Sequence, residues 1–366
     1  MRGKGINYDT GFFNAGTSTH EPFEPERVRR EMRVIRDDLH CTAVRVTGGD
    51  AERLKIAATL SAEAGLAVWL CPFTNDVSED ALLALLADCA AHAEGLREAG
   101  AEVVMLTGAE LSLFLPGVLP GDSLADRLAL IADPSRVRPL IVQARARLDD
   151  FLGRAVDVVR ARFRGPVSYA SLPLEGVDWT RFDVIATDAG YRTAGTAATF
   201  RALMRAFVAQ GRAQGKPVAV TEFGCATYRG AADAGKDAHA LVAWGDDGRP
   251  SHLKGEYVRD EAEQATYLRE LLEVFESEGV GAAFVYTFAR YDLPHRDDPR
   301  DAHLDLDRAS AGVVRVLVGE RGARARRGRR YPHMPWEPKV AFDTLADCYG
   351  RQLPPAAETD LSSPPV

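Results

Sequence analysis

Residues 216–224 read KPVAVTEFG, a short apolar run that ends in a carboxylate, Glu222, with a glycine two positions later. Residues 101–110 repeat the pattern, because AEVVMLTGAE is apolar through its centre and ends in Glu110. A buried strand that carries an acid at its C-terminal end is costly unless the acid is paired or used. The chain therefore offers two strand-end glutamates, and a fold that brings them together would suit chemistry based on two carboxylates.

Short apolar runs of this kind recur along the chain. They are nearly continuous in Val, Ile, Leu and Ala instead of alternating with polar residues, which is typical of parallel strands covered on both faces. The predicted strands are 4–9, 41–47, 66–72, 101–107, 166–172, 183–188, 217–222 and 281–288.

Longer amphipathic stretches separate these strands. Asp50 and Ser78 open two of the stretches and suit helix N-capping. Eight strands with seven or eight intervening helices predict an α/β fold of the (β/α)8, or TIM, barrel type. An open doubly wound sheet is the alternative, but it usually has a glycine-rich phosphate turn after its first strand, and residues 6–11 (INYDTG) are not one. The predicted helices are 25–39, 50–64, 78–99, 136–164, 196–214, 259–279 and 336–351.

Three connections are long, and each follows the C-terminal end of a strand. They are residues 108–135 after strand four, 223–258 after strand seven and 289–335 after strand eight. That face of a barrel carries the active site, so we expect these insertions to build walls or a lid around a pocket. Residues 1–352 are predicted to form one barrel domain, and residues 353–366, with four prolines, a disordered tail.

Composition narrows the class of protein. A chain of 366 residues with 46% hydrophobic and 27% charged residues can build a full globular core. Its net charge of −8 disfavours nucleic acid or an anionic membrane surface as the main partner. Residues 1–4 lead directly into a strand-like segment without the apolar core of a signal peptide. The five cysteines show no CxxC spacing, so we expect reduced thiols in a cytoplasmic protein.

Glu110 follows the fourth predicted strand and Glu222 ends the seventh, and the ends of these two strands lie across one mouth in such a barrel. Two carboxylates about 5–5.5 Å apart suit a retaining glycosidase, in which one attacks the anomeric carbon and the other protonates the departing oxygen and later activates water. Repulsion and unequal surroundings can separate the pKa values of the two groups accordingly. Each glutamate could instead belong to a structural ion pair, because such networks also perturb acids.

Several segments resemble the (β/α)8 enzymes of glycoside hydrolase clan A, which carry a glutamate at the ends of strands four and seven. Residues 220–224 (VTEFG) look like that clan's nucleophile segment, and residues 42–46 (TAVRV) look like its second strand. Tyr191 resembles a tyrosine that often hydrogen-bonds the nucleophile, and residues 336–342 (WEPKVAF) resemble the usual entry into the last helix.

The resemblance implies a role for each matching residue. Glu222 would be the nucleophile, Glu110 the general acid–base, and Arg45 and Tyr191 the supports of Glu222. The activity implied is that of a retaining O-glycoside hydrolase or transglycosidase. This implied activity and the absence of a recognisable secretion signal together predict a small soluble glycoside or glycosylated metabolite as the substrate.

The chain departs from the clan's pattern at two places. The residue before the acid–base is usually Asn, whose amide binds the sugar 2-hydroxyl, and here it is Ala109. The last strand usually offers a Trp as a sugar platform, whereas residues 286–288 read YTF. Two alternatives therefore stay open: a sugar-binding barrel without hydrolysis, and a barrel enzyme that uses the same carboxylates for a non-glycosidic reaction.

Arg45 has an apolar residue on each side, so we expect it to point into the barrel mouth and to pair with Glu222 or another acid. Asn7 and Asp9 end the first strand, and strand alternation places both side chains on one face. We expect them either to contact the substrate or to close the first turn. The full set of predicted substrate-binding residues is Asn7, Asp9, Arg45, Asp188, Tyr191, Tyr286 and Arg290.

No metal or cofactor is predicted. The eight histidines are scattered, with no HExxH motif and no paired spacing. The expected partner is a small-molecule carbohydrate, with neither nucleic acid nor membrane involved.

Overall fold

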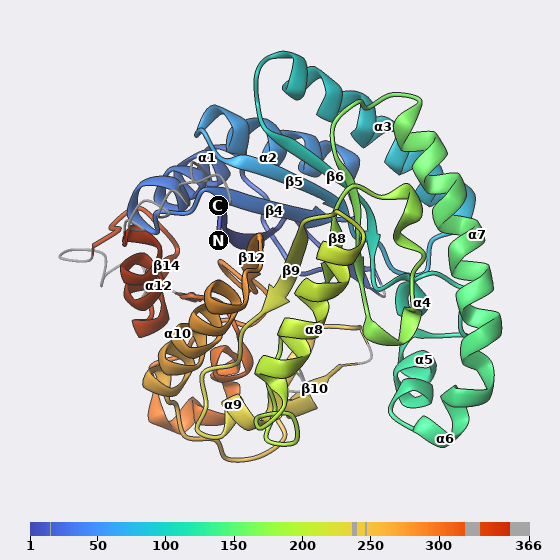
Figure 1. Ribbon diagram of the computed structural model, residues 1–366. Helices are drawn as coiled ribbons and strands as arrows, with labels where there is room; N and C mark the ends of the chain where they lie inside the picture. The colour runs from blue at the N-terminus through green and yellow to red at the C-terminus, as the bar shows by residue number, and fades with distance from the viewer. Residues whose placement is uncertain (15, 236–239, 246, 319–329, 352–366) are drawn as a thin grey trace, which may run out of the picture.

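The computed structural model describes residues 1–351 except residue 15, residues 236–239, residue 246 and residues 319–329. The tail predicted for residues 353–366 lies outside the described residues, and the domain boundary stays a prediction. Eight parallel strands close into a barrel in the order β1-β12-β9-β8-β7-β6-β5-β4, which confirms the (β/α)8 fold (Figure 1). The strands are β1 (Gly3–Asp9), β4 (Ala43–Gly48), β5 (Ala67–Pro72), β6 (Val103–Ala109), β7 (Val167–Ser171), β8 (Ile185–Thr187), β9 (Val218–Phe223) and β12 (Ala282–Val285).

Helices surround the strands on the outside of the barrel (Figure 1). The two predicted caps are present, since Asp50 accepts from the Arg53 amide at 2.9 Å and Ser78 accepts from the Ala81 amide at 3.2 Å. The short connection after β7 holds two single 3-10 turns, η3 (Pro173–Glu175) and η4 (Trp179–Arg181). The long helices are α1 (Pro25–Arg33), which continues as the π-turn η1 (Val34–Asp38), α2 (Ala51–Glu63), α3 (Glu79–Glu98), α7 (Ile141–Arg160), α8 (Phe200–Ala213), α10 (Glu261–Glu278) and α12 (Val340–Gly350).

The barrel interior is filled mainly by alanines and two large rings. Trp69 and Phe284 face each other inside the barrel with ring centroids 4.9 Å apart. A Cβ at Gly5 would lie 2.3 Å from the Phe284 ring, so only glycine leaves room for this filling. An arginine placed in such an apolar interior needs partners of opposite charge.

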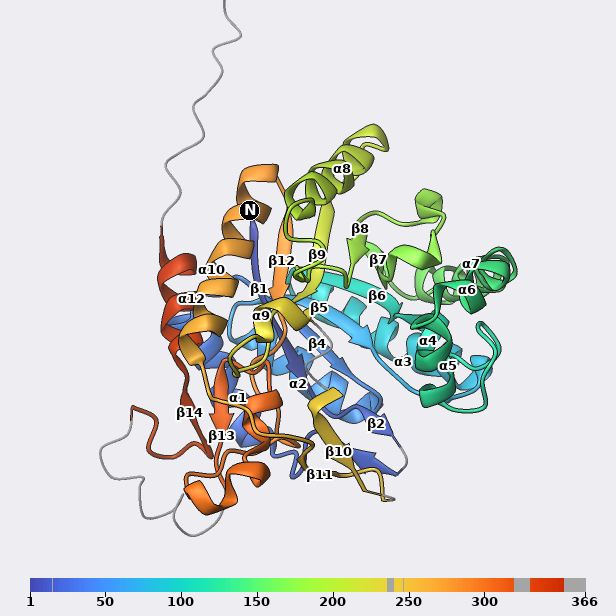
Figure 2. The same cartoon turned by 90° about the horizontal axis from the view of Figure 1, so that it is seen from below.

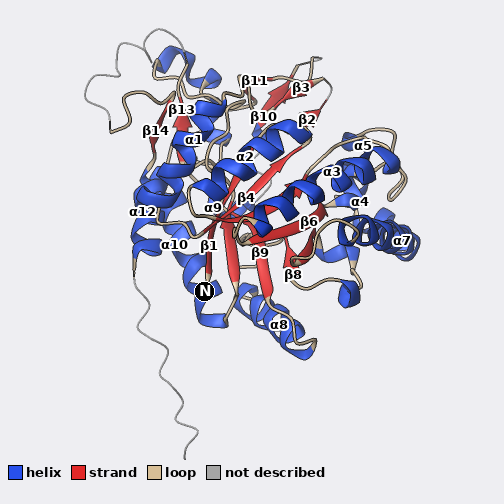
Figure 3. Ribbon diagram, turned by 90° about the horizontal axis from the view of Figure 1, so that it is seen from above, coloured by secondary structure: helices blue, strands red, loops and turns tan. Residues whose placement is uncertain are grey.

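The C-terminal ends of the strands carry the insertions, as predicted. Among the described residues, three small two-stranded antiparallel sheets lie at the end of the barrel opposite the N-terminus (Figures 2 and 3). The hairpins after β1 and β9 touch, because the Thr17 hydroxyl donates to the Gly248 carbonyl at 3.3 Å. These smaller elements are β2 (Phe13–Asn14), β3 (Thr17–Ser18), α4 (Leu111–Phe114), α5 (Leu124–Ile131), α6 (Pro134–Val137), α9 (Ala231–Ala234), β10 (Val242–Trp244), β11 (Pro250–Leu253), β13 (Val314–Val316) and β14 (Trp336–Pro338).

Among the helices of the described residues, none has both the length and the apolar character that crossing a membrane would require.

Candidate active site

An irregular step in β9 turns Glu222 toward the barrel mouth. Between the pairs Val220–Ala283 and Phe223–Val285, β9 advances by three residues while β12 advances by two. Such a β-bulge inserts one residue and interrupts the alternation of side chains between the two faces. Val220 and Phe223 both pack outward against the helices. The extra residue between them allows both Thr221 and Glu222 to leave that outward face.

A second irregular step precedes Glu110. Between the pairs Leu106–Ser168 and Ala109–Ala170, β6 advances by three residues while β7 advances by two. Leu106 and Ala109 both belong to the inward cluster, although strict alternation would place residues three apart on opposite faces. The bulge thus carries the end of β6 inward immediately before Glu110.

The backbone of Glu110 is in the left-handed region, with φ 46° and ψ 40°. For a residue with a Cβ this conformation costs roughly 1–2 kcal/mol, so neighbouring interactions must hold it. The Glu110 amide donates to the Ala170 carbonyl of β7 at 2.9 Å. Strained residues of this kind concentrate at functional sites, which makes Glu110 a candidate on conformational grounds alone.

A buried pair, Tyr169 and Glu175, holds the two residues that follow Glu110. The Leu111 amide donates to the Tyr169 hydroxyl at 2.7 Å, and the Ser112 amide donates to Glu175 Oε1 at 2.9 Å. The Tyr169 hydroxyl itself donates to Glu175 Oε1 at 2.9 Å. Burial raises the pKa of Glu175 to about 7, against the lowering effect of the amides that bond it. These hydrogen bonds from β7 and η3 hold the left-handed turn at Glu110 in place.

Arg45 is fully buried and lies between two carboxylates. Its Nη1 is 2.9 Å from Glu222 Oε1 and 3.2 Å from Asp188 Oδ1. A second contact joins Nη2 to Asp188 Oδ2 at 3.4 Å. The expected pairing of Arg45 with Glu222 is therefore present in the structure, and Asp188 shares the same guanidinium. Asp188 is 1% exposed and contributes to this ion pair, which leaves it little surface for a substrate.

Tyr191 bonds the other oxygen of Glu222, since its hydroxyl donates to Oε2 at 3.2 Å. Burial, followed by the negative charge of Glu222, raises the pKa of the Tyr191 phenol well above its usual value, so the hydroxyl keeps its proton. The chain before Tyr191 runs close to β9, where the Gly190 amide donates to the Glu222 carbonyl at 3.1 Å. A Cβ at Gly190 would lie 2.4 Å from that carbonyl oxygen, so glycine is required there.

Three carboxylates converge at the mouth. One oxygen from each of Glu110, Asp188 and Glu222 lies within 4.8 Å of the others. Such a group could in principle bind a cation, and it is the one carboxylate group of this kind among the described residues. The Arg45 guanidinium already lies against two of the three, and its positive charge disfavours a metal at the same place.

Burial and, after it, the charge balance of this cluster raise the pKa of Glu222. Burial is the largest cause and the charge of Asp188 the second, whereas Arg45 and Tyr191 lower the pKa, and the outcome is a value of about 8. One guanidinium cannot neutralise several neighbouring carboxylates, so the cluster tends to keep a proton near neutral pH. Arg45 and Tyr191 both stabilise the ionised form of Glu222, which favours leaving that proton on another carboxylate.

We expect Asp188→Asn to move the acid limb of the pH–activity profile to lower pH. The substitution removes the negative charge that repels Glu222 and leaves Arg45 to pair with Glu222 alone, and both effects lower the pKa of Glu222. A shift of about 1 pH unit or more is expected for charges this close. The measurement is kcat/KM against pH. Asp183→Asn, two residues before the start of β8, is the control. An acid limb in Asp188→Asn that is unchanged or moved to higher pH would contradict the assignment.

Asn7 and Asp9 lie at the end of β1, and their side chains hydrogen-bond other groups of the protein. The Asn7 amide donates to the Thr221 carbonyl at 2.9 Å, and its oxygen accepts from Arg45 at 3.2 Å. Asp9 accepts from the Gly11 amide at 2.8 Å and from the Thr19 hydroxyl. Asn7 thus helps to hold Arg45, and Asp9 closes the turn after β1. The geometry favours the turn-closure interpretation for Asp9.

Tyr286 and Arg290 follow β12 on the same rim. Arg290 forms a two-point ion pair with Asp292, at 2.8 and 2.6 Å, and its Nη1 donates to the Tyr286 hydroxyl at 3.4 Å. Burial and Glu222 raise the pKa of Tyr286, while Arg290 lowers it. This electrostatic coupling to Glu222 is consistent with Tyr286 lying at the mouth, and its role as a substrate contact stays a prediction.

Three residues of the site, Tyr169, Glu175 and Gly190, carry no sequence pattern that singles them out. Gly108, two residues before Glu110, was the available sign of a bulge, because a glycine within a strand often marks one. Nothing in the local sequence marks Tyr169 and Glu175, which come from the next strand and the turn after it.

Comparison with known proteins gives structural matches only, since no protein-family profile and no curated protein matches this chain. One solved structure, described as a complex of a GH113 β-1,4-mannanase, is 18% identical with a TM-score of 0.60, covering 96% of this chain and 100% of that one. The GH113 β-mannanase from Alicyclobacillus acidocaldarius is 14% identical with a TM-score of 0.54, over 95% and 97% of the two chains.

A third similar structure is the β-glucuronidase of Parabacteroides merdae, 14% identical with a TM-score of 0.51. The match covers 95% of this chain and 36% of that larger one. These similarities confirm the (β/α)8 fold that the resemblance to clan A enzymes predicts.

Proposed function

We propose that this chain is a retaining O-glycoside hydrolase or transglycosidase with Glu222 as nucleophile and Glu110 as general acid–base. The observation that carries the proposal is the closeness of the two strand-end carboxylates, since one oxygen of Glu110 lies within 4.8 Å of one oxygen of Glu222. A separation of about 5–5.5 Å between the carboxyl groups suits direct attack, whereas inverting enzymes need about 6.5–9.5 Å to admit a water.

The reaction has two steps. In the first, a Glu222 oxygen bonds to the anomeric carbon, the glycosidic C–O bond breaks, and Glu110 gives its proton to the departing oxygen. In the second, water attacks the same carbon, Glu110 takes a proton from it, and the bond to Glu222 breaks. An acceptor alcohol in place of water would make the enzyme a transglycosidase.

Arg45 and Tyr191 support the nucleophile in this scheme. Each bonds a different oxygen of Glu222, so the two bonds fix the plane of the carboxylate and stabilise its ionised form. Fixing the attacking group in this way reduces the entropy lost on reaching the transition state.

The proposed substrate is a small soluble glycoside or glycosylated metabolite handled in the cytoplasm. The matched mannanases and glucuronidase share the fold at low identity, so mannosides and glucuronides are reasonable first members of a substrate panel. Tyr286 and Arg290, which follow β12, remain the proposed sugar contacts. Arg290 already pairs with Asp292, so it would act mainly by holding the Tyr286 hydroxyl toward the sugar.

Ala109 favours a second candidate function, a barrel that binds a sugar without hydrolysing it. Its side chain is fully buried in the apolar interior cluster and offers no amide for a 2-hydroxyl. In glycosidases that contact strengthens in the transition state and contributes several kcal/mol.

Turnover of aryl glycosides, followed by NMR of the first-formed product, separates these functions. The panel covers α- and β-linked glucosides, mannosides, galactosides and glucuronides. We expect hydrolysis of at least one member with retention of the anomeric configuration. Inversion would contradict the mechanism, and saturable binding without any hydrolysis would favour the non-hydrolytic barrel.

A further inference from the structure

The segment between β8 and α8 that carries Asp188 and Tyr191 is bonded to Glu222 at several points. Asp188 shares Arg45 with Glu222, the Gly190 amide donates to the Glu222 carbonyl, and the Tyr191 hydroxyl donates to its carboxylate. Residues 188–192 form neither helix nor strand. The position of the Tyr191 ring therefore depends on what holds this irregular segment in place.

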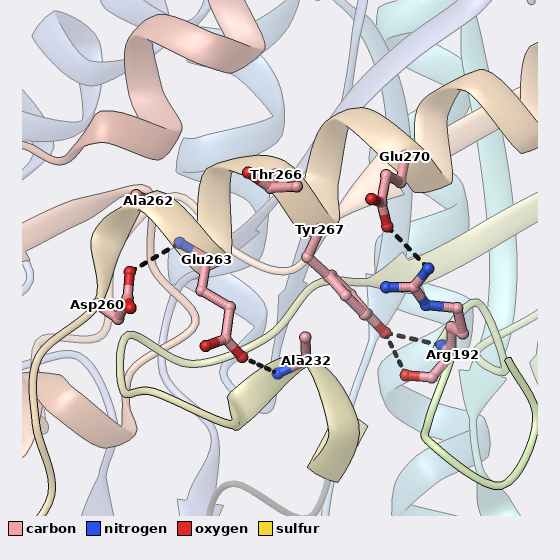
Figure 4. Close-up of a pocket in the computed structure, with 8 residues that line it drawn as sticks. All are labelled: Arg192, Ala232, Asp260, Ala262, Glu263, Thr266, Tyr267 and Glu270. Carbon is pink, nitrogen blue, oxygen red and sulfur yellow. Dashed lines mark hydrogen bonds and ion pairs between the residues drawn. The ribbon is translucent and has the colours of Figure 1, made fainter.

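Tyr267 of α10 holds it from outside the barrel. Its hydroxyl donates to the Arg192 carbonyl and accepts from the Arg192 amide, each at 2.7 Å (Figure 4). Both backbone groups of the residue after Tyr191 are thus satisfied by one phenol. Tyr267 is 1% exposed, and burial raises the pKa of its phenol, so the hydroxyl remains able to donate.

Helix α10 also contacts the strand that carries Glu222, the acceptor of the Tyr191 hydrogen bond. Phe275 of α10 packs edge-on against Phe223, the residue after Glu222, with ring centroids 4.9 Å apart. Helix α10 therefore holds the neighbour of Tyr191 and the neighbour of Glu222 at once. A rigid helix that contacts both segments can fix the distance between the phenol and the carboxylate.

We propose that Tyr267 is a positioning residue that sets the hydrogen bond between Tyr191 and Glu222. The proposal rests on the proposed function, in which Glu222 is the nucleophile. Tyr267 does not touch the reacting atoms and acts through the backbone of Arg192.

The surface pocket beside Tyr267 is better explained by this role than by a ligand. It has a volume of about 440 Å³, and its acidic side chains already accept hydrogen bonds or ion pairs (Figure 4). Asp260 accepts from the Glu263 amide at 3.0 Å, Glu263 accepts from the Ala232 amide at 2.9 Å, and Glu270 pairs with Arg192 at 2.7 Å. These contacts anchor the start of α10 and the loop after β9.

The Arg192–Glu270 ion pair is a weaker candidate for the same task. Its side chains are 28% and 47% exposed, and exposed pairs contribute little. Glu270→Gln is therefore a matched control that disturbs the same residue without removing the Tyr267 hydrogen bonds.

The test is Tyr267→Phe, compared with Tyr191→Phe and with the double variant. Loss of the Tyr191 donor raises the pKa of Glu222, so both single variants should move the acid limb of kcat/KM to higher pH. We expect kcat to fall roughly tenfold in Tyr267→Phe with KM little changed, because displacement of an active-site group mainly slows the chemistry. The acid limb of the double variant should shift no further than that of Tyr191→Phe alone, since both substitutions act through the Tyr191–Glu222 hydrogen bond.

A readout independent of turnover keeps this test separate from the proposed function. Carboxyl-¹³C NMR of labelled protein, with the Glu222 signal assigned through Glu222→Gln, follows the titration of Glu222 even if no substrate is found. Tyr349→Phe controls for the loss of a buried phenol, because Tyr349 bonds the Gly5 carbonyl of β1 at 3.0 Å. A 4-fluorophenylalanine at position 267 keeps the volume if Tyr267→Phe does not fold.

The outcomes are distinct. A raised Glu222 titration in Tyr267→Phe, absent in Tyr349→Phe and Glu270→Gln, supports the proposal. An unchanged titration, or a double variant whose shift equals the sum of the two single shifts, overturns it. Absence of turnover with the Glu222 shift present would contradict the glycosidase function and leave the coupling between Tyr267 and Glu222 established.

Discussion

Glu222→Gln is expected to lower kcat by at least about 10⁴-fold while the protein stays folded. The amide has nearly the same shape but cannot attack the anomeric carbon, and loss of a nucleophile has effects of this order or larger. Asp188 remains as a partner for Arg45, so the guanidinium is not left unpaired in the interior. The measurement is kcat on the best aryl glycoside, with a thermal unfolding scan of the same sample.

Glu31→Gln is the matched control for this substitution. Glu31 is also a buried carboxylate, but it lies on α1 outside the cluster of Glu110, Asp188 and Glu222, and it accepts from the Trp336 indole at 2.7 Å and from the Tyr8 and Tyr291 hydroxyls. We expect Glu31→Gln to lower stability and to leave turnover per folded molecule nearly unchanged. Glu222→Gln with near-normal kcat would exclude Glu222 as the nucleophile.

Glu110→Ala is expected to show the second-largest effect, a fall of about 10²–10⁴-fold for substrates with poor leaving groups. Substrates whose leaving group needs no protonation should keep a fast first step and accumulate the glycosyl-enzyme. A small anion such as azide can occupy the space left by the carboxylate and attack that intermediate without a general base. Added azide should therefore restore turnover and give a glycosyl azide.

Glu102→Ala provides the control for Glu110→Ala, because Glu102 is exposed and lies just before the other end of β6. Glu102→Ala should have the same turnover as the unmodified protein for every leaving group, with or without azide. An equal loss for all leaving groups in Glu110→Ala, with no response to azide, would contradict the acid–base assignment and point to a structural role for the left-handed turn.

The barrel could be predicted because its strands are buried on both faces and read as uninterrupted apolar runs. Residues 217–222 and 41–47 show this, and the observed β9 and β4 differ from them by one or two residues. The insertions were predicted only as long connections. The strand pairs β10–β11 and β13–β14 within them contact segments distant in sequence, through the Thr17–Gly248 and Trp336–Glu31 hydrogen bonds, and no local pattern encodes such contacts.

The site was predictable to the extent that it depends on strand position. The pairing of Arg45 with Glu222 follows from alternation along β4, and the structure contains it. Simple alternation would not have turned Glu222 inward, because a β-bulge makes that turn and depends on the neighbouring strand. Tyr267 lies on an amphipathic helix, where a tyrosine is expected in the core, so its contact with Arg192 was visible only in three dimensions.

A covalent trap tests the central claim most directly. The protein is incubated with the 2-deoxy-2-fluoro glycosyl fluoride of its best substrate, and the intact mass and peptides are measured. The account predicts one added fluoro-sugar, carried by the peptide that contains Glu222 and absent in Glu222→Gln. A label on any other residue, or active enzyme that stays unlabelled and releases product of inverted configuration, would contradict it.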